Sequence, residues 1–165
     1  MKSGQKKHIW APISTIAGIV LAALIMILVF ARPFDSLTPI ELGPSNYGVS
    51  EAIDISAEQY NTMLSEKQSF VLMVDNPGCI TTAKMREMLS SFSDNLKFRY
   101  YRIYWQDTVN TNIREYIKYF PSILIVSSGK VAEALHADSD TDAKYYNNAE
   151  DLEKWLKTYV IFPKN

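Results

Sequence analysis

The chain contains one residue suited to covalent redox chemistry, a single cysteine at position 79. An apolar run at residues 70–74 ends in Asp75-Asn76-Pro77-Gly78, and a helical pattern begins directly after Cys79. The thiol therefore lies at the N-terminus of a predicted helix, where free backbone N–H groups and the helix dipole favour the thiolate. A thiolate in this place can attack disulfides, which indicates thiol–disulfide exchange.

Three residues further along the same helical face is Thr82, at the spacing where a second cysteine would release a mixed disulfide. A hydroxyl can only hydrogen-bond to the sulfur, so an external thiol must carry out the release. The competing interpretation of Cys79 is an unreactive buried thiol, since free cysteine is among the most buried residue types. Neither histidine, His8 or His136, has an evident orienting partner for a Cys–His pair.

A second candidate segment lies about forty residues later, where Tyr119-Phe120-Pro121 leads into the apolar run 122–127. If the bond before Pro121 is cis, Phe120 presents its main-chain amide and carbonyl as a ledge for an extended peptide. If the bond is trans, Pro121 simply ends a helix. The residues alone leave both interpretations open.

Alternating strand and helix patterns must position these residues. Ser56-Ala57-Glu58-Gln59 is a capping box, and Met85, Met88, Leu89 and Phe92 mark one apolar helix face. The predicted elements are strand 49–54, helix 56–67, strand 69–75, a helix from 79, strand 97–105, helix 113–120, strands 122–127 and 130–136, and helix 148–159. Right-handed crossovers make the early strands parallel, the terminal hairpin adds an antiparallel strand, and helices cover both faces.

This βαβαβαββα order resembles the thioredoxin-like superfamily over roughly residues 49–160. The likeness rests on Val71-Leu72-Met73-Val74 leading to Cys79, Phe120-Pro121-Ser122 at the place of the family's cis-proline, Gly129 in the hairpin, and residues 148–152 opening the last helix. Residues 76–82 are also similar to the Pro-x-Cys-x-x-Cys form of thioredoxin-like bacterial accessory proteins, including those associated with bacteriocin export.

The resemblance implies an α/β thioredoxin-like fold, a cis bond at Pro121 and one-cysteine chemistry on a degenerate Cys-x-x-Thr motif. It implies no cofactor. Under it, the expected catalytic residues are Cys79 and Thr82, and the expected substrate contacts are Gly78, Ile80, Phe120 and Pro121.

Two departures from the family weaken efficient two-cysteine chemistry. Gly78 stands where the family usually has tryptophan, and Met73 stands where many members carry a buried acid. In a different register Cys79 would be the second cysteine and Asn76 would replace the first. That register leaves too short a link after the strand and shifts the pair Met88-Leu89, so we prefer Cys79 as the nucleophile.

The N-terminal part predicts a membrane anchor. Residues 9–31 carry no ionisable side chain and would form a helix of roughly 34 Å. Three lysines precede this run and one arginine comes after it, so we expect residues 1–8 in the cytoplasm and the rest exported. A signal peptide cleaved after Ala31 is the alternative, but the apolar run exceeds the usual length of such peptides.

We therefore expect a linker at 32–48, rich in Pro and Gly, and an extracytoplasmic domain at 49–165, placed by the family likeness in a bacterial cell envelope. Without residues 1–34 the chain carries 13 Lys and Arg against 18 Asp and Glu, which argues against nucleic-acid binding. The acidic run 138–142 imitates half of a calcium loop, but Ala143 replaces the required glycine, so a solvated loop and no metal are expected.

The expected partners are cysteine-containing exported proteins, small disulfides or a membrane partner protein. Two other functions remain open from the sequence. One is a non-enzymatic binding module of a membrane or export system that keeps the thioredoxin scaffold. The other is a purely structural ectodomain within a membrane complex.

Overall fold

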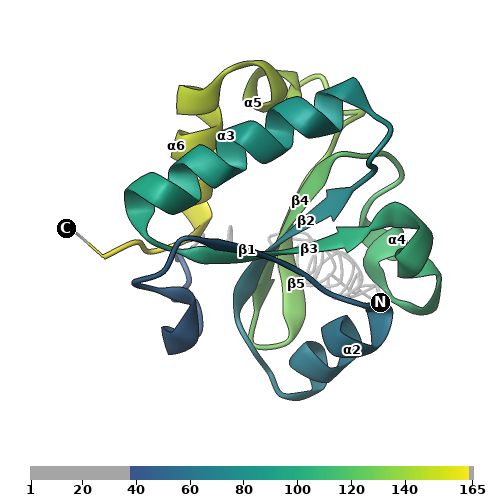
Figure 1. Cartoon of the computed structure of the whole chain (residues 1–165), viewed down its shortest axis with the longest axis vertical. Coiled ribbons are helices and arrows are strands. Elements are labelled where there is room, and N and C mark those ends of the chain that lie inside the picture. The colour runs from purple at the N-terminus through teal and green to yellow at the C-terminus, as the bar shows by residue number, and fades with distance from the viewer. Residues whose placement is uncertain (1–37, 164–165) are drawn as a thin grey trace, which may run out of the picture. The chain divides into compact units, whose positions relative to one another are not determined.

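The computed structural model describes residues 38–163, which form a mixed α/β fold (Figure 1). The elements are η1 Pro44–Asn46, β1 Glu51–Asp54, α2 Ala57–Ser65, β2 Phe70–Asp75, α3 Ile80–Leu96, β3 Arg99–Tyr104, η2 Trp105–Asn110, α4 Ile113–Tyr116, β4 Ser122–Ser127, β5 Lys130–Leu135, α5 Ala143–Asn147 and α6 Ala149–Tyr159. The predicted order of strands and main helices is confirmed. The predicted anchor at 9–31 lies outside the described residues, and no helix within 38–163 is long and apolar enough to span a bilayer.

Five strands form one sheet in the order β1-β3-β2-β4-β5. Strands β1, β3 and β2 are parallel, β4 runs antiparallel to β2, and β5 runs antiparallel to β4. All six residues of the central strand β2 are buried, as expected for a strand with both faces covered by helices.

The side chains of β2 alternate between two cores. Val71 and Met73 face α3 and α6, where they pack with Leu89 and Trp155. Leu72 and its neighbours on the other face pack against α2 and α4. The capping box that starts α2 is present, with Ser56 and Gln59 each accepting a hydrogen bond from the other's backbone N–H.

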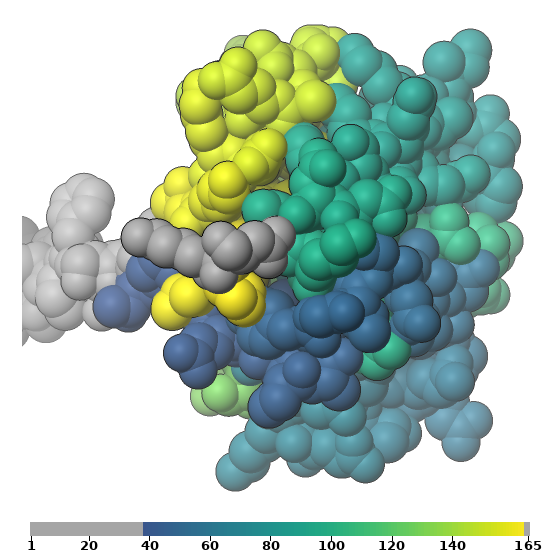
Figure 2. Space-filling view, turned by 60° about the vertical axis from the view of Figure 1, so that its left-hand side comes forward, coloured from purple at the N-terminus to yellow at the C-terminus, as the bar shows by residue number. Residues whose placement is uncertain are grey.

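Part of the predicted linker belongs to the folded domain. Leu42 is only 3% exposed and lies in the core beneath α3 and α6. Ile40 bridges Val160, and the Tyr47 hydroxyl donates to the carbonyl of Ile161 at 2.7 Å. Figure 2 shows these purple and blue residues beside the yellow C-terminal segment. The Pro and Gly content predicted a spacer, but the interspersed apolar side chains bind the segment to the domain.

Two loops also differ from the prediction. Helix α4 ends at Tyr116 instead of 120, because Ile117 adopts an extended conformation. The predicted loop 137–147 contains α5, which the buried Tyr146 attaches to the core through a hydrogen bond to the carbonyl of Leu135.

Candidate functional site

Cys79 is the N-cap residue of α3, as the sequence predicts. Its backbone is extended, its N–H donates to the carbonyl of Asn76 at 3.1 Å, and its carbonyl accepts the first helical hydrogen bond from Ala83 at 3.2 Å. The side chain is partly exposed. The interpretation of Cys79 as a sealed core thiol is therefore wrong.

The first turn of α3 follows Cys79 directly, and no side chain forms a cap hydrogen bond with it. No side-chain oxygen caps the helix and no acidic residue lies in its first turn. The Cys79 side chain occupies the place where Ser or Asp usually accepts hydrogen bonds from the second and third helical N–H groups. The pKa of the thiol is lowered, mainly by the backbone N–H of Thr82 and then by its hydroxyl, although partial burial opposes the shift and Thr81 adds a smaller lowering.

Thr82 is fully buried, and its Oγ1 is the buried side-chain polar atom that lacks a hydrogen-bond partner among the described residues. A buried hydroxyl without a partner normally costs free energy. No bond of ordinary geometry satisfies this hydroxyl, and the sulfur of Cys79 is the group whose charged form it stabilises. The arrangement suits a thiolate better than a neutral thiol.

The sheet register brings the two predicted site segments to the same end of the sheet. Val74 at the end of β2 pairs with Ser122 at the start of β4. The connection that carries Cys79 leaves β2 and the connection that carries Pro121 enters β4, so both lie at the same end of the sheet (Figure 1). The Phe120–Pro121 bond is cis, as the resemblance predicted.

Packing and a hydrogen bond hold the second segment, residues 119–121, in place. The ring of Phe120 packs against Trp105 with centroids 5.3 Å apart, and Pro121 is buried. The Ser122 hydroxyl donates to the carbonyl of Tyr119 at 2.8 Å. These contacts fix the turn that enters β4.

Exposed apolar side chains accompany both segments. Ile80, the residue after Cys79, is 90% exposed, and Tyr119, the residue before Phe120, is 56% exposed. Gly78 is exposed too, and a side chain at its position would meet no atom within 4 Å. The surface next to the thiol is thus open and partly apolar.

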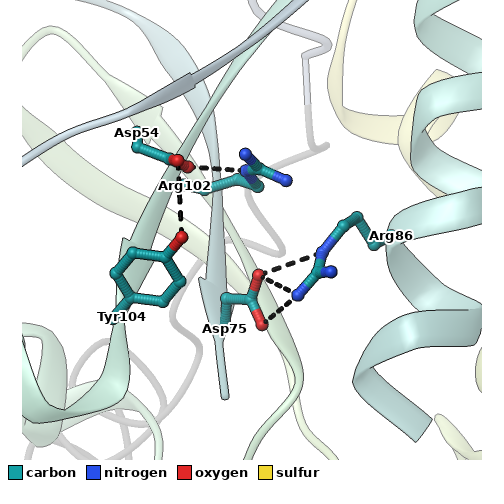
Figure 3. A network of polar contacts seen from close by, with 5 residues as sticks. All are labelled: Asp54, Asp75, Arg86, Arg102 and Tyr104. Atoms are coloured by element: carbon teal, nitrogen blue, oxygen red, sulfur yellow. Dashed lines mark hydrogen bonds and ion pairs between the residues drawn. The ribbon is translucent and has the colours of Figure 1, made fainter. Parts of the chain in front are cut away.

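Sequence reasoning missed a buried ion pair next to this site (Figure 3). Asp75 has no exposed side-chain surface, and both of its carboxylate oxygens accept hydrogen bonds from Arg86 of α3. Met73, where the family's acid was sought, is a buried apolar core residue. The chain does bury an acid, two positions later than expected. The sequence feature that indicates it is the single carboxylate, Asp75, at the end of an apolar strand.

A neighbouring set of charges joins the edge strand β1 to β3. The Nε of Arg102 donates to Asp54 at 2.7 Å, and the hydroxyl of Tyr104 donates to the same carboxylate at 3.4 Å (Figure 3). Arg99 pairs with Glu51 three residues earlier on the same two strands. These pairs fix the register of the edge strand and contain no nucleophile.

The acidic run 138–142 makes local contacts. The carboxylate of Asp142 accepts a hydrogen bond from the backbone N–H of His136 at 3.0 Å. Within residues 38–163, no three His, Cys, Asp or Glu side chains are grouped to hold a metal ion.

No family model matches the chain, and no curated protein sequence does. Among solved structures, a single-site mutant of the thioredoxin from Halobacterium salinarum aligns with a TM-score of 0.54 at 8% identity, over 70% of this chain and 96% of that one. A thioredoxin from Nicotiana alata aligns with a TM-score of 0.52 at 14% identity, over 68% of this chain and 96% of that one. The described part of the chain therefore has a thioredoxin-like fold.

Proposed function

We propose that the chain is a membrane-anchored, extracytoplasmic thioredoxin-fold protein that uses Cys79 for thiol–disulfide exchange or thiol capture on exported proteins. The observation that carries this proposal is the sulfur at the N-cap of α3. Its pKa is lowered by the backbone N–H and hydroxyl of Thr82, and its side chain is partly exposed.

The proposed first step is attack by the Cys79 thiolate on a disulfide sulfur of the substrate. A mixed disulfide forms, and the second substrate sulfur leaves as a thiolate. Thr82 cannot attack this mixed disulfide as a second cysteine would. The complex then either persists as captured substrate or is opened by another thiol.

Substrate binding is proposed at the surface around the two segments. Gly78 and Ile80 flank Cys79 in the sequence, and Phe120 and Pro121 directly precede β4, which neighbours β2 in the sheet. An extended peptide lying along Phe120 would present its cysteine to the sulfur and an apolar side chain to Ile80.

The proposed location rests on the N-terminal sequence. The uncharged run 9–31 and the lysines before it favour an uncleaved anchor with the domain outside the cytoplasm, and the family likeness favours a bacterial envelope. Such a compartment permits disulfides in the proposed partners, which are cysteine-containing exported proteins or a membrane protein.

The proposal is tested by alkylating the full-length chain in detergent at pH 6. Cys79 should react at least about tenfold faster than a cysteine in an unstructured peptide, because a larger fraction is thiolate. Cells that produce the chain should also contain mixed disulfides that disappear with Cys79→Ser. Alkylation at the peptide rate would overturn the proposal.

A non-enzymatic binding module is the second candidate, and the exposed Ile80 and Tyr119 favour it. Binding through this surface needs no sulfur. Crosslinking to a membrane partner would then survive Cys79→Ser but decrease with Ile80→Glu. Loss of crosslinking in Cys79→Ser would exclude this candidate.

A further inference from the structure

We infer that the domain docks on the surface of the lipid bilayer through an apolar hollow at the C-terminal end of α3, with Cys79 on the side away from the membrane. This inference rests on the proposed anchor at residues 9–31 and adds an orientation to it. The hollow has a volume of about 590 Å³. It lies between Pro39, near the start of the described chain, Leu96, the last residue of α3, and residues 160–163, which follow α6.

Direct contacts hold the lining of this hollow to the domain. The N–H of Ile40 donates to the carbonyl of Tyr159 at 2.8 Å, and the N–H of Ile161 donates to the carbonyl of Ile40 at 2.9 Å. The ring of Phe162 packs against the buried Phe98, with centroids 4.9 Å apart. The segment that enters the domain and the segment that follows its last helix therefore form one fixed surface.

This surface leaves apolar side chains in contact with solvent. Ile161 is 45% exposed, and Pro39 and Pro163 are exposed as well. Among the described residues that line the hollow, the charged one is Lys157, and its ammonium pairs with Glu153. Because that charge is compensated, contact with the bilayer should depend on the burial of apolar side chains and not on attraction to anionic lipids.

The place of the hollow in the chain selects the bilayer as its occupant. Pro39 follows Ala31, the last residue of the proposed anchor, by eight residues. These residues can span at most roughly 29 Å. To bring the opposite end of α3 to the hydrocarbon layer, they would have to cover the length of this helix and the headgroup layer together, roughly 31 to 33 Å. The face that carries the hollow is the one that the proposed anchor holds against the membrane.

Docking in this way places the candidate nucleophile far from the membrane. Cys79 directly precedes α3, which has 17 residues, and the hollow lies at the other end of this helix. Figure 1 shows the C-terminal segment beside that end. A helix of this length separates the two sites by roughly 25 Å. Substrates would then reach Cys79 from the aqueous side, which favours exported proteins over membrane-embedded ones as its partners.

The test uses the full-length chain with Cys79→Ser in nanodiscs of phosphatidylcholine, one copy per disc, with a fluorescent label on a single introduced cysteine. A label at Ile161→Cys should be quenched by iodide about tenfold less than a label at Val109→Cys, an apolar position that is 64% exposed. Phospholipids brominated on their acyl chains should quench the label at 161 and not the label at 109. Addition of anionic lipid should change neither result.

A second pair of variants tests the apolar contact itself. With the label at Pro39→Cys, Ile161→Glu should increase quenching by iodide about tenfold, because a carboxylate resists transfer into the apolar layer. Val109→Glu, at the other exposed apolar position, should leave the quenching unchanged. Both replaced side chains are exposed, so neither change empties the core.

The outcomes separate docking from the anchor on which it rests. Release of the full-length chain from vesicles by alkaline carbonate would overturn both. Retention in the vesicles, with equal quenching by iodide at 161 and 109, would overturn docking alone. Protection from iodide without quenching by brominated lipid would identify residues 32–37 as the occupant, and protection that needs two copies per disc would identify a second copy. Either result would overturn the bilayer as the occupant.

Discussion

The buried carboxylate of Asp75 and the guanidinium of Arg86 form a bidentate ion pair, with Nη2 at 2.7 Å from Oδ2 and 3.0 Å from Oδ1. The pair connects the last residue of β2 to the second turn of α3 (Figure 3). Cys79 lies in the connection between these two points. The ion pair therefore holds together the two elements from which the candidate nucleophile projects.

Replacing Arg86 with Met should destabilise the domain by about 3 kcal/mol, because the buried Asp75 loses its charged partner. This is the low end of the range for buried pairs, since Arg86 is 36% exposed and water can reach the site. Chemical unfolding of the full-length chain measures the loss.

Two controls accompany this variant. Combining Arg86→Met with Asp75→Asn should recover part of the loss, because no uncompensated buried charge remains. Glu150→Gln breaks an exposed pair with Lys154 and should cost no more than about 0.5 kcal/mol. Equal stability of Arg86→Met and Glu150→Gln would contradict the structural role given to the buried pair.

The lowered pKa of Cys79 predicts a dependence of stability on pH. Because the folded-state pKa lies below the unfolded one, the thiolate's contribution is complete above the unfolded pKa and is lost as the pH falls through the folded pKa. The stability of the wild type relative to Cys79→Ala should therefore rise from pH 6 to pH 9. Unfolding under reducing conditions at several pH values checks this, and a difference independent of pH would refute it.

Two glycines have the same φ angle but different surroundings, so we expect their substitution by alanine to cost different amounts of folding free energy. Gly129 and Gly48 both have φ of +77°, a conformation that side chains rarely adopt. A Cβ at Gly129 would lie 2.2 Å from the carbonyl oxygen of Leu64, whereas one at Gly48 would meet nothing within 4 Å. Gly48→Ala should cost about 1 kcal/mol and Gly129→Ala at least about 3 kcal/mol, as measured by urea unfolding. Equal costs would show that the turn can move away from α2.

The packed segment before β1 gives a further test. Leu42→Ala should lower the free energy of unfolding by about 2 to 4 kcal/mol, because it leaves a cavity in the core beneath α3 and α6. The neighbouring Glu41 is exposed, so Glu41→Ala should change stability by less than about 0.5 kcal/mol. Equal effects of the two substitutions would contradict the packing of Leu42 in the core and support the interpretation of this segment as a spacer.

Local patterns predicted the parts of the site that depend on local chemistry. The N-cap position of Cys79 was evident from the change of hydrophobic period around it, and the capping box of α2 from four consecutive residues. The cis bond before Pro121 came from the family resemblance and not from the residue itself.

Features that depend on tertiary contact were not predicted. Asp75 and Arg86 meet only because α3 crosses back over the end of β2, which no local pattern specifies. Tyr146 similarly attaches a polar segment to the core through Leu135. The buried state of Thr82 also required the packing of α3 on the sheet.

The first turn of α3 lowers the pKa of the Cys79 thiol, which makes two backbone amides indicators of the site's covalent state. The backbone N–H groups of Thr81 and Thr82 both lower the pKa of Cys79, so they favour the negative sulfur of the free thiolate. That atom becomes neutral once it is joined to another sulfur. Their proton resonances therefore distinguish loaded from unloaded molecules without any label on the partner.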